Sequence, residues 1–314
     1  MKFDNRFILV IVGFIALYAI FIIFSDINQV YEKIIEIKPG YLGIIFALLP
    51  VSWFILFSRW HLLLENSDIN ISVKDSLKIY FSSAALLVIP GKVGELIKIQ
   101  ILKEKCNVPR TKSAPIIIIE QLYNLVGIIA VSIVGLFLFD YSTIIIGIST
   151  AFLVFLFIIL SSKKIYYKCM KIFGKIKFIS KFTDSLMESH EIIRKSMSGK
   201  ILFYSAILST LFWLTEAVIV YFILLSFGID HLEILAVITT YASSIILGVA
   251  SFLPMGIGVV EGSLTGFLSL QGVDISIGLS IVVIIRIFTR WIVVGVGFIA
   301  LKTTGFLSLK NTKF

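Results

Sequence analysis

The sequence contains few residues of the kinds that build disulfide frameworks or metal centres. It has only two cysteines, Cys106 and Cys169, and three histidines scattered along the chain. Both cysteines fall in segments that we expect on the cytoplasmic side of a membrane, and no His or Cys spacing matches a metal site. The sequence therefore predicts neither a disulfide framework nor a bound metal or cofactor.

Charged residues are also scarce. They make up 15% of the 314 residues, whereas 58% are hydrophobic and the mean hydropathy is +1.03. Several apolar stretches reach the roughly 18 residues that indicate a membrane-spanning helix. This composition excludes a soluble domain and predicts one all-α polytopic membrane domain over residues 1–314. The net charge of +9 then reflects loop asymmetry rather than nucleic-acid binding.

Six apolar segments are long enough to be full transmembrane helices. The second of them carries Arg59, Trp60 and His61 near its end, and these are expected to lie at the interface, where Trp anchors and Arg snorkels. The six spans are expected at about 7–24, 41–64, 113–139, 142–160, 201–227 and 275–301.

Two other segments are too interrupted or too charged to cross a bilayer. The first, at about 76–105, has a Pro-Gly turn at 90–91 and four charged residues in its second arm. The second, at about 234–271, contains Pro254 followed by two glycines. We expect both to be re-entrant helical hairpins, whose non-helical tips are tolerated at depth only where protein or water surrounds them.

The basic residues indicate the topology. Seven lysines and no acidic residue occur between 163 and 181, which marks residues 161–200 as a basic cytoplasmic loop. With two re-entrant hairpins, both termini are cytoplasmic and all but four of the 28 Lys and Arg residues lie on the inner side. If each hairpin region crossed once instead, the lysine-rich loop would be external, against the positive-inside rule.

A short motif occurs twice and indicates duplication. Pro-Gly-Lys-Val-Gly-Glu at 90–95 is echoed by Pro-Met-Gly-Ile-Gly-Val-Val-Glu at 254–261. Residues 1–139 and 142–301 would then form two repeats of opposite membrane orientation. Inverted-topology repeats in transporters place the substrate site near the midplane, where broken helices meet.

The spacing of polar residues after each motif supports the duplication. Glu95 precedes Glu120 by 25 residues and Asn124 by 29, and Glu261 precedes Arg286 and Arg290 by the same intervals. Arginines four residues apart share a helix face. A charge inside a span costs roughly 2.5–3.5 kcal/mol, so these side chains should face protein or water rather than lipid.

The candidate substrate-binding residues lie in the two motifs and in the spans. The arginines are expected to bind a lipid phosphate, or else to pair with Glu120 or Glu216. The intramembrane acids could in turn receive a cationic headgroup or carry a coupling proton. The full set is Gly91, Lys92, Gly94, Glu95, Glu120, Asn124, Glu216, Gly256, Gly258, Glu261, Arg286 and Arg290.

Simpler roles remain open for several of these residues. The glycines either turn the hairpin tips and expose helix N–H groups to a phosphate, or only allow close helix packing. Glu95 and Glu261 fall in a first helical turn, where a carboxylate also acts as a cap. Lys92 and Lys98 either hold a headgroup near the cytoplasmic entrance or are solvated lysines.

The motifs resemble the lysylphosphatidylglycerol synthase transmembrane region, also called the flippase-like family. The resemblance spans nearly the whole chain and implies a role in moving aminoacylated phosphatidylglycerol or a lipid-carried sugar between leaflets. Family members often have Glu-Arg-x-x-Asp at the positions of Glu120 to Asn124, and an Arg where Val260 stands here. Residues 1–314 show no soluble aminoacyltransferase domain.

Three functions follow as hypotheses. The first is a flippase in the cell membrane that moves an anionic phospholipid or a polyprenyl-phosphate-linked headgroup by alternating access at a polar cavity between the hairpins. The second is a proton- or ion-coupled transporter of a small solute. The third is a membrane enzyme or the accessory subunit of a lipid-modifying or glycosylation enzyme. Because no nucleophile–base pair has a useful spacing, we expect a transporter and not an enzyme.

Overall fold

Every element that the structure describes is helical. The structure is a computed structural model, and it describes residues 38–87, 93–133, 140–173, 187 and 189–305. Its elements are α3 (Pro39–Asn66), α4 (Val73–Ala84), α5 (Val93–Cys106), α6 (Arg110–Ser132), α7 (Asp140–Ser161), α8 (Lys163–Phe173), α10 (His190–Ser196), α11 (Gly199–Ser226), α12 (Ile234–Ala250), η3 (Pro254–Gly256), α13 (Val259–Ser269), α14 (Ile275–Arg286), η4 (Ile287–Trp291) and α15 (Ile292–Thr303).

Four helical stretches are long and apolar enough to cross a membrane. They are α3, α6, α11 and the continuous stretch 275–303, and α7 makes a fifth if it and α8, which is bent from it by 99°, count as one span. The multi-pass, all-α prediction is thus confirmed over the described residues. The expected first span at 7–24 lies outside them, as does the first hairpin tip at 88–92.

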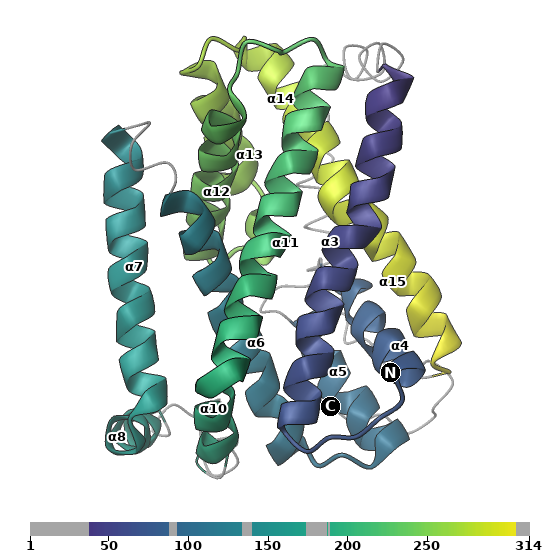
Figure 1. The fold of residues 1–314 in the computed structure, drawn as a ribbon, viewed down its shortest axis with the longest axis vertical. Coiled ribbons are helices and arrows are strands. Elements are labelled where there is room, and N and C mark those ends of the chain that lie inside the picture. Colours follow the sequence, from purple (N-terminus) through teal and green to yellow (C-terminus); the bar gives the residue numbers. More distant parts are fainter. Residues whose placement is uncertain (1–37, 88–92, 134–139, 174–186, 188, 306–314) are drawn as a thin grey trace, which may run out of the picture.

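The two predicted hairpins are helix pairs at opposite ends of the bundle (Figure 1). α4 packs against α5, and α12 packs against α13. Ser72 caps α4 by accepting a hydrogen bond from the Asp75 backbone N–H at 3.1 Å, which satisfies one of the free donors of the first turn. Each hairpin also packs on the other half of the chain, α4 on α15 and α12 on α6.

Two long helices form the centre of the molecule. α3 and α11 lie side by side (Figure 1), and α6 also packs closely on α11. The closest approach is at Gly127 of α6, where an added Cβ would lie 2.5 Å from the Ser209 carbonyl oxygen. Two apolar cores flank this centre. One is formed mainly by α11 to α14, and the other by α4, α5 and α6 with the C-terminal half of α3.

The basic segment after α7 includes short helices rather than loop alone. α8 exposes Lys164, Lys168 and Lys171 beside Ile165 and Ile172, while other side chains of the helix pack toward the bundle. Such a basic amphipathic helix is typical of the membrane surface. The rest of the expected loop at 161–200 includes α10, and residues 174–186 and 188 lie outside the described part.

Candidate functional site

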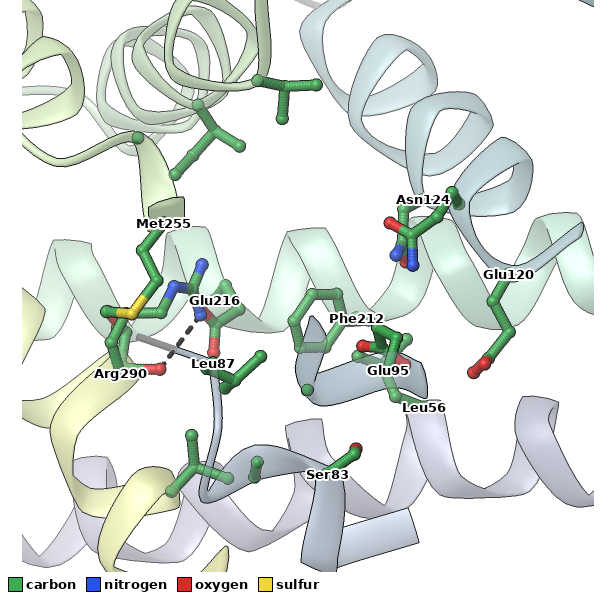
Figure 2. A pocket seen from close by; sticks show the side chains of 18 of the residues that line it. Leu56, Ser83, Leu87, Glu95, Glu120, Asn124, Phe212, Glu216, Met255 and Arg290 are labelled. Atoms are coloured by element: carbon green, nitrogen blue, oxygen red, sulfur yellow. Dashed lines mark hydrogen bonds and ion pairs between the residues drawn. The ribbon is translucent and has the colours of Figure 1, made fainter. Parts of the chain in front are cut away.

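A cavity of about 590 Å³ lies between the two hairpins (Figure 2). The first hairpin contributes Ser83, Gly94 and Glu95 to its wall, and the second contributes Met255 and Gly256. The rest of the lining comes from helices α3, α6 and α11, the π-helical turn η4 and Val293 of α15. The cavity therefore joins residues from both halves of the chain, at the place where the sequence predicts that function lies.

The cavity wall carries equal numbers of opposite formal charges. Its described cations are Arg59, Lys98 and Arg290, and its described carboxylates are Glu95, Glu120 and Glu216. Each of the six has an oppositely charged partner within 4 Å. Intramembrane charges are tolerated when they are paired in this way and face a cavity or the bundle interior.

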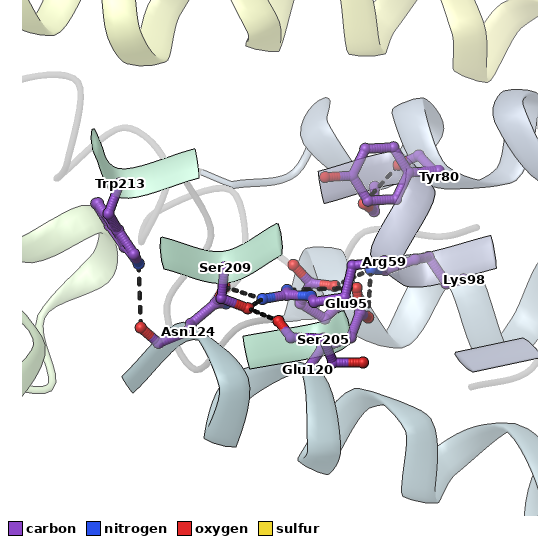
Figure 3. A network of polar contacts seen from close by, with 10 residues as sticks. Arg59, Tyr80, Glu95, Lys98, Glu120, Asn124, Ser205, Ser209 and Trp213 are labelled. Carbon is purple, nitrogen blue, oxygen red and sulfur yellow. Dashed lines mark hydrogen bonds and ion pairs between the residues drawn. The ribbon is translucent and has the colours of Figure 1, made fainter. Parts of the chain in front are cut away.

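Lys98 is the centre of the first-hairpin cluster, which we define as Arg59, Glu95, Lys98, Glu120 and Asn124 (Figure 3). Its ammonium donates to Glu120 Oε2 at 2.8 Å and pairs with Glu95 on its own helix. It also lies 4.5 Å from the ring centroid of Trp60 and 5.2 Å from that of Tyr80. Only 2% of its side chain is exposed, so the prediction of a solvated lysine at this position is wrong.

Arg59 joins this cluster to the centre of the bundle. Its Nη1 donates to Asn124 Oδ1 at 2.9 Å and to Ser209 Oγ at 2.7 Å, while Nη2 lies 3.9 Å from Glu120 Oε1. The expected snorkelling of Arg59 toward water is wrong, because its side chain is buried among the helices. It turns inward because α6 and α11 offer these acceptors, which the spacing of α3 alone does not reveal.

The second-hairpin cluster consists of Ser52, Glu216, Tyr241 and Arg290. Arg290 Nη1 donates to Glu216 Oε2 at 2.9 Å; both residues are labelled in Figure 2. The Tyr241 hydroxyl donates to the same oxygen at 3.1 Å. Ser52 Oγ lies 3.5 Å from Glu216 Oε1. Glu216 is fully buried, whereas 16% of the Arg290 side chain is exposed. Arg290 is thus the most exposed of the three cations that line the cavity.

A π-helical turn presents Arg290 to the cavity. η4 interrupts the helical stretch 275–303 between α14 and α15, and it contains Thr289 and Arg290, both of which line the cavity. Single π-helical turns inside α-helices are rare and are frequent at functional sites.

Trp213 lies between the two clusters. Its indole Nε1 donates to the backbone oxygen of Asn124 at 3.0 Å (Figure 3). Its ring lies 5.9 Å from the Arg290 guanidinium carbon, within cation–π range. The Trp213 side chain therefore contacts one residue of each cluster, Asn124 of the first-hairpin cluster and Arg290 of the second-hairpin cluster.

Arg286 lies outside this cavity. Its Nε donates to Glu261 Oε1 at 2.8 Å, and its Nη2 donates to the Met255 backbone oxygen. The predicted partners Glu120 and Glu216 are therefore wrong for Arg286. For Arg290 the predicted partner Glu216 is confirmed. Arg286 fixes the second hairpin tip to α14, since the other Glu261 oxygen, Oε2, accepts the Gly258 N–H at 2.7 Å.

The capping interpretation of Glu261 is therefore confirmed. The structure shows glycines that turn the second tip and glycines that allow close packing, while binding of a phosphate by the helix N–H groups stays a prediction. Gly256 and Gly258 have φ of 67° and 86°, so they turn the second tip in a conformation that L side chains rarely adopt. An added Cβ at Gly94 would lie 2.8 Å from the Ser83 backbone oxygen, so this glycine allows the arms of the first hairpin to pack closely. Gly91 and Lys92 lie outside the described residues.

The remaining candidates meet at the cavity. The candidates that line it are Gly94, Glu95, Glu120, Asn124, Glu216, Gly256 and Arg290. Three other candidates, Gly258, Glu261 and Arg286, do not line it. Sequence reasoning missed Arg59, Tyr241 and Trp213. Arg59 alone carried a usable signal, because an arginine in an apolar helix needs a partner.

Comparison with known proteins places this architecture in a family. The lysylphosphatidylglycerol synthase TM region matches residues 8–297. The chain belongs to this family. It is also 26% identical to a UPF0104 membrane protein of Methanocaldococcus jannaschii over 230 residues, covering 72% of this chain and 96% of that protein. A UPF0104 membrane protein of Pyrococcus horikoshii is 23% identical over 98% of both chains. The family resemblance inferred from the motifs is thus confirmed.

Proposed function

We propose that the cavity binds the phosphate of an anionic phospholipid or of a lipid-linked headgroup and moves it between leaflets. The observation that carries this proposal is Arg290, a partly exposed guanidinium on a π-helical turn at the wall of the cavity between the two hairpins. A guanidinium binds phosphate oxygens through two parallel N–H donors. Arg290 has acceptors of its own, as Arg59 and Lys98 do, but the side chains of Arg59 and Lys98 are almost fully buried.

The cavity also has an apolar side that suits lipid tails. Phe252 and Leu253 line it at the second hairpin tip, and Phe252 is 88% exposed. A headgroup held at Arg290 could therefore leave its hydrocarbon chains in the bilayer beside this tip. A fully enclosed polar cavity would suit a small solute instead.

The mechanism that we propose is alternating access by two inverted repeats, with six full spans and both termini in the cytoplasm. Two reciprocal contacts between α3 and α11 support the repeat. Ser52 of α3 pairs with Glu216 of α11, and Arg59 of α3 pairs with Ser209 of α11. Ser52 and Ser209 are 157 positions apart in the sequence, as are Arg59 and Glu216. A two-fold relation between the halves would exchange these two contacts.

A third contact repeats in the same way. Arg59 binds Asn124 at 2.9 Å, and Glu216 binds Arg290 at 2.9 Å. Asn124 and Arg290 hold the same position, 29 residues after each motif glutamate. Each half therefore has a contact between its long central helix and the residue 29 positions after its motif glutamate, but the charges differ. This pattern fits a duplicated unit that binds an asymmetric headgroup.

The test is leaflet translocation in vesicles that contain the purified protein. Short-chain fluorescent phosphatidylglycerol and phosphatidylcholine are compared for the unchanged protein, for Arg290→Gln and for Arg194→Gln. Arg194 is an exposed arginine at the end of α10 and serves as the matched control. We expect headgroup-dependent movement that Arg290→Gln reduces at least tenfold and that Arg194→Gln leaves unchanged.

Failure of every lipid to move, with protein that is folded by its thermal transition, would contradict the proposal. It would favour a small-solute transporter or an accessory subunit of a lipid-synthesising enzyme. Equal movement by Arg290→Gln and the unchanged protein would remove Arg290 as the phosphate site.

A further inference from the structure

We propose that α8 is a second lipid-binding site, which holds the headgroups of anionic phospholipids at the cytoplasmic surface and inserts two isoleucines among their acyl chains. The site is separate from the cavity, and it does not depend on the function proposed for that cavity. Three features carry the inference: the angle between α8 and α7, a stripe of lysines along α8, and an apolar stripe beside it.

The bend between α7 and α8 places α8 along the membrane surface. The 22 residues of α7, at about 1.5 Å each, span about 33 Å, which is enough to cross the hydrocarbon core without α8. α8 turns from α7 by 99°. A helix that is nearly perpendicular to a spanning helix lies close to the plane of the membrane. α8 and the first hairpin lie at the same end of the bundle (Figure 1), the end that the lysine-rich sequence predicts to be cytoplasmic.

The lysine stripe consists of Lys164, Lys168 and Lys171. Their spacing of four and three residues puts them on one face of the helix, and all three are exposed. The ion pairs between described residues include none of them. The sequence has no acidic residue between 163 and 181 that could neutralise them. Three ammonium groups on one face are therefore available to anionic headgroups.

The apolar stripe consists of Ile165 and Ile172, whose side chains are 38% and 58% exposed. Each directly follows a lysine of the lysine stripe, so the two stripes lie about 100° apart around the helix. An acidic protein or a nucleic acid would use the lysines alone, whereas a lipid surface also buries the isoleucines. The two stripes together therefore favour a lipid surface.

Contacts with the bundle fix which face of α8 points outward. Tyr166 is only 1% exposed, and its ring centroid lies 4.7 Å from that of His190 on α10. The Tyr167 hydroxyl donates to the Met187 backbone oxygen at 3.2 Å. With these tyrosines turned inward, both stripes of α8 face away from the bundle, and no conformational change is needed to expose them.

The lysine stripe distinguishes lipids by their net charge. The phosphate of phosphatidylglycerol carries a negative charge that no group of the same lipid neutralises, whereas the phosphate of phosphatidylcholine is balanced by choline. Exposed lysines near the membrane surface therefore attract the first lipid more strongly than the second. Because the lysines are exposed, salt screens this attraction. α8 should enrich anionic lipid at low salt and lose the enrichment at high salt.

The experiment measures which lipid surrounds α8 in vesicles that contain the full chain. The reporter is a bimane fluorophore attached at Ile172→Cys in a background with Cys106→Ser and Cys169→Ser. Phosphatidylglycerol and phosphatidylcholine, each with a nitroxide near the headgroup end of one acyl chain, are compared as quenchers at equal mole fraction. We expect phosphatidylglycerol to quench about fivefold more effectively, an enrichment equal to the effect of one lysine at the surface.

The decisive variant combines Lys164→Gln, Lys168→Gln and Lys171→Gln, which removes the lysine stripe and keeps an apolar stripe. The preference for phosphatidylglycerol should fall to about one. A matched control changes the net charge equally at three exposed lysines of α4, α5 and α15 that belong to no such stripe: Lys74→Gln, Lys103→Gln and Lys302→Gln. The control should keep the preference. A preference that survives loss of the lysine stripe, or that the control also loses, would overturn the inference.

The remaining outcomes are equally clear. Weak quenching by both lipids would place α8 away from the membrane, which would overturn the inference and favour an acidic protein partner. Equal quenching by both lipids, with the lysine stripe intact, would overturn it as well. About 1 M salt should reduce the preference toward one, and a preference that salt leaves unchanged would contradict its electrostatic origin. The measurement needs no lipid translocation, so its result is independent of the proposed function.

Discussion

The first-hairpin and second-hairpin clusters share one kind of contact but differ in their charges. In the first, one lysine serves two carboxylates, and an arginine on α3 binds a neutral asparagine on α6. In the second, a glutamate on α11 binds an arginine that follows its motif glutamate by 29 residues, the same spacing as for the asparagine. The first cluster is therefore closed on itself, and the second holds a guanidinium that is partly exposed to the cavity.

This difference separates two uses of buried charge. Lys98 and Arg286 hold segments together: Lys98 pairs with glutamates on α5 and α6, and Arg286 fixes a hairpin tip to α14. Arg290 has one carboxylate partner and an exposed edge. We infer that Lys98 and Arg286 stabilise the fold and that Arg290 binds substrate. The following experiments address this distinction.

The largest expected effect is in the side of the membrane from which each hairpin can be labelled. If the hairpins enter from opposite sides, Cys106 reacts with a membrane-impermeant maleimide only from the cytoplasmic side. A cysteine introduced by Glu233→Cys in a variant without native cysteines should react only from outside. Burial and the nearby Asp75 raise the pKa of the Cys106 thiol, so labelling will be slower than for a free thiol and faster at higher pH. Labelling of both positions from one side would contradict the inverted arrangement.

Lys98→Met is expected to be the most destabilising change of a single charge. It leaves Glu95 and Glu120 facing each other without their shared ammonium, and breaking a buried pair costs about 3–5 kcal/mol. The midpoint of thermal unfolding in detergent should fall markedly. Adding Glu120→Gln to this variant should recover part of the loss. A variant as stable as the unchanged protein would show that the first-hairpin cluster is not structural.

Arg286→Gln and Arg290→Gln should differ in which property they change. Arg286→Gln leaves Glu261 buried without its cation, so we expect a loss of about 3 kcal/mol in unfolding free energy. Arg290→Gln also leaves a buried carboxylate, Glu216, without its cation, so its loss of stability should be similar, but only Arg290→Gln should abolish lipid movement. The two variants are compared by thermal unfolding and by translocation in the same vesicles. The reverse pattern would exchange the roles assigned to these arginines.

Trp213→Phe should have the smallest effect. It keeps an aromatic ring beside Arg290 but removes the N–H that binds the Asn124 backbone oxygen, a loss of about 1 kcal/mol. Phe212→Leu, at the neighbouring position of α11, serves as a control that leaves this hydrogen bond intact. Weaker lipid movement in Trp213→Phe alone would indicate that the bridge couples the two clusters.

Much of the fold could be predicted because its signals are local. Apolar length predicted the second span at 41–64, which the structure has as α3. The Pro-Gly turn at 90–91 predicted the first helix pair, and Pro254 with the two glycines after it predicted the second. The π-helical turn η4 has no such signal, since Ile287–Trp291 contains neither proline nor glycine.

The candidate site was only partly predictable, for a physical reason. The positions of charged residues within apolar segments identify side chains that need partners, such as Glu216 and Arg290. Which partner each one has depends on how the helices pack, which the sequence does not show. Arg286 pairs with Glu261 because the second hairpin tip lies against α14. Arg59 turns inward because α6 and α11 meet beside it.

The central claim is that Arg290 holds an anionic headgroup in this cavity, and lipid retention tests it most directly. Native mass spectrometry would count phosphatidylglycerol molecules that stay bound to the purified unchanged protein, to Arg290→Gln and to Arg194→Gln. We predict that the unchanged protein and Arg194→Gln retain one tightly bound lipid and that Arg290→Gln, folded by its thermal transition, loses it. Equal retention by all three proteins would contradict the claim.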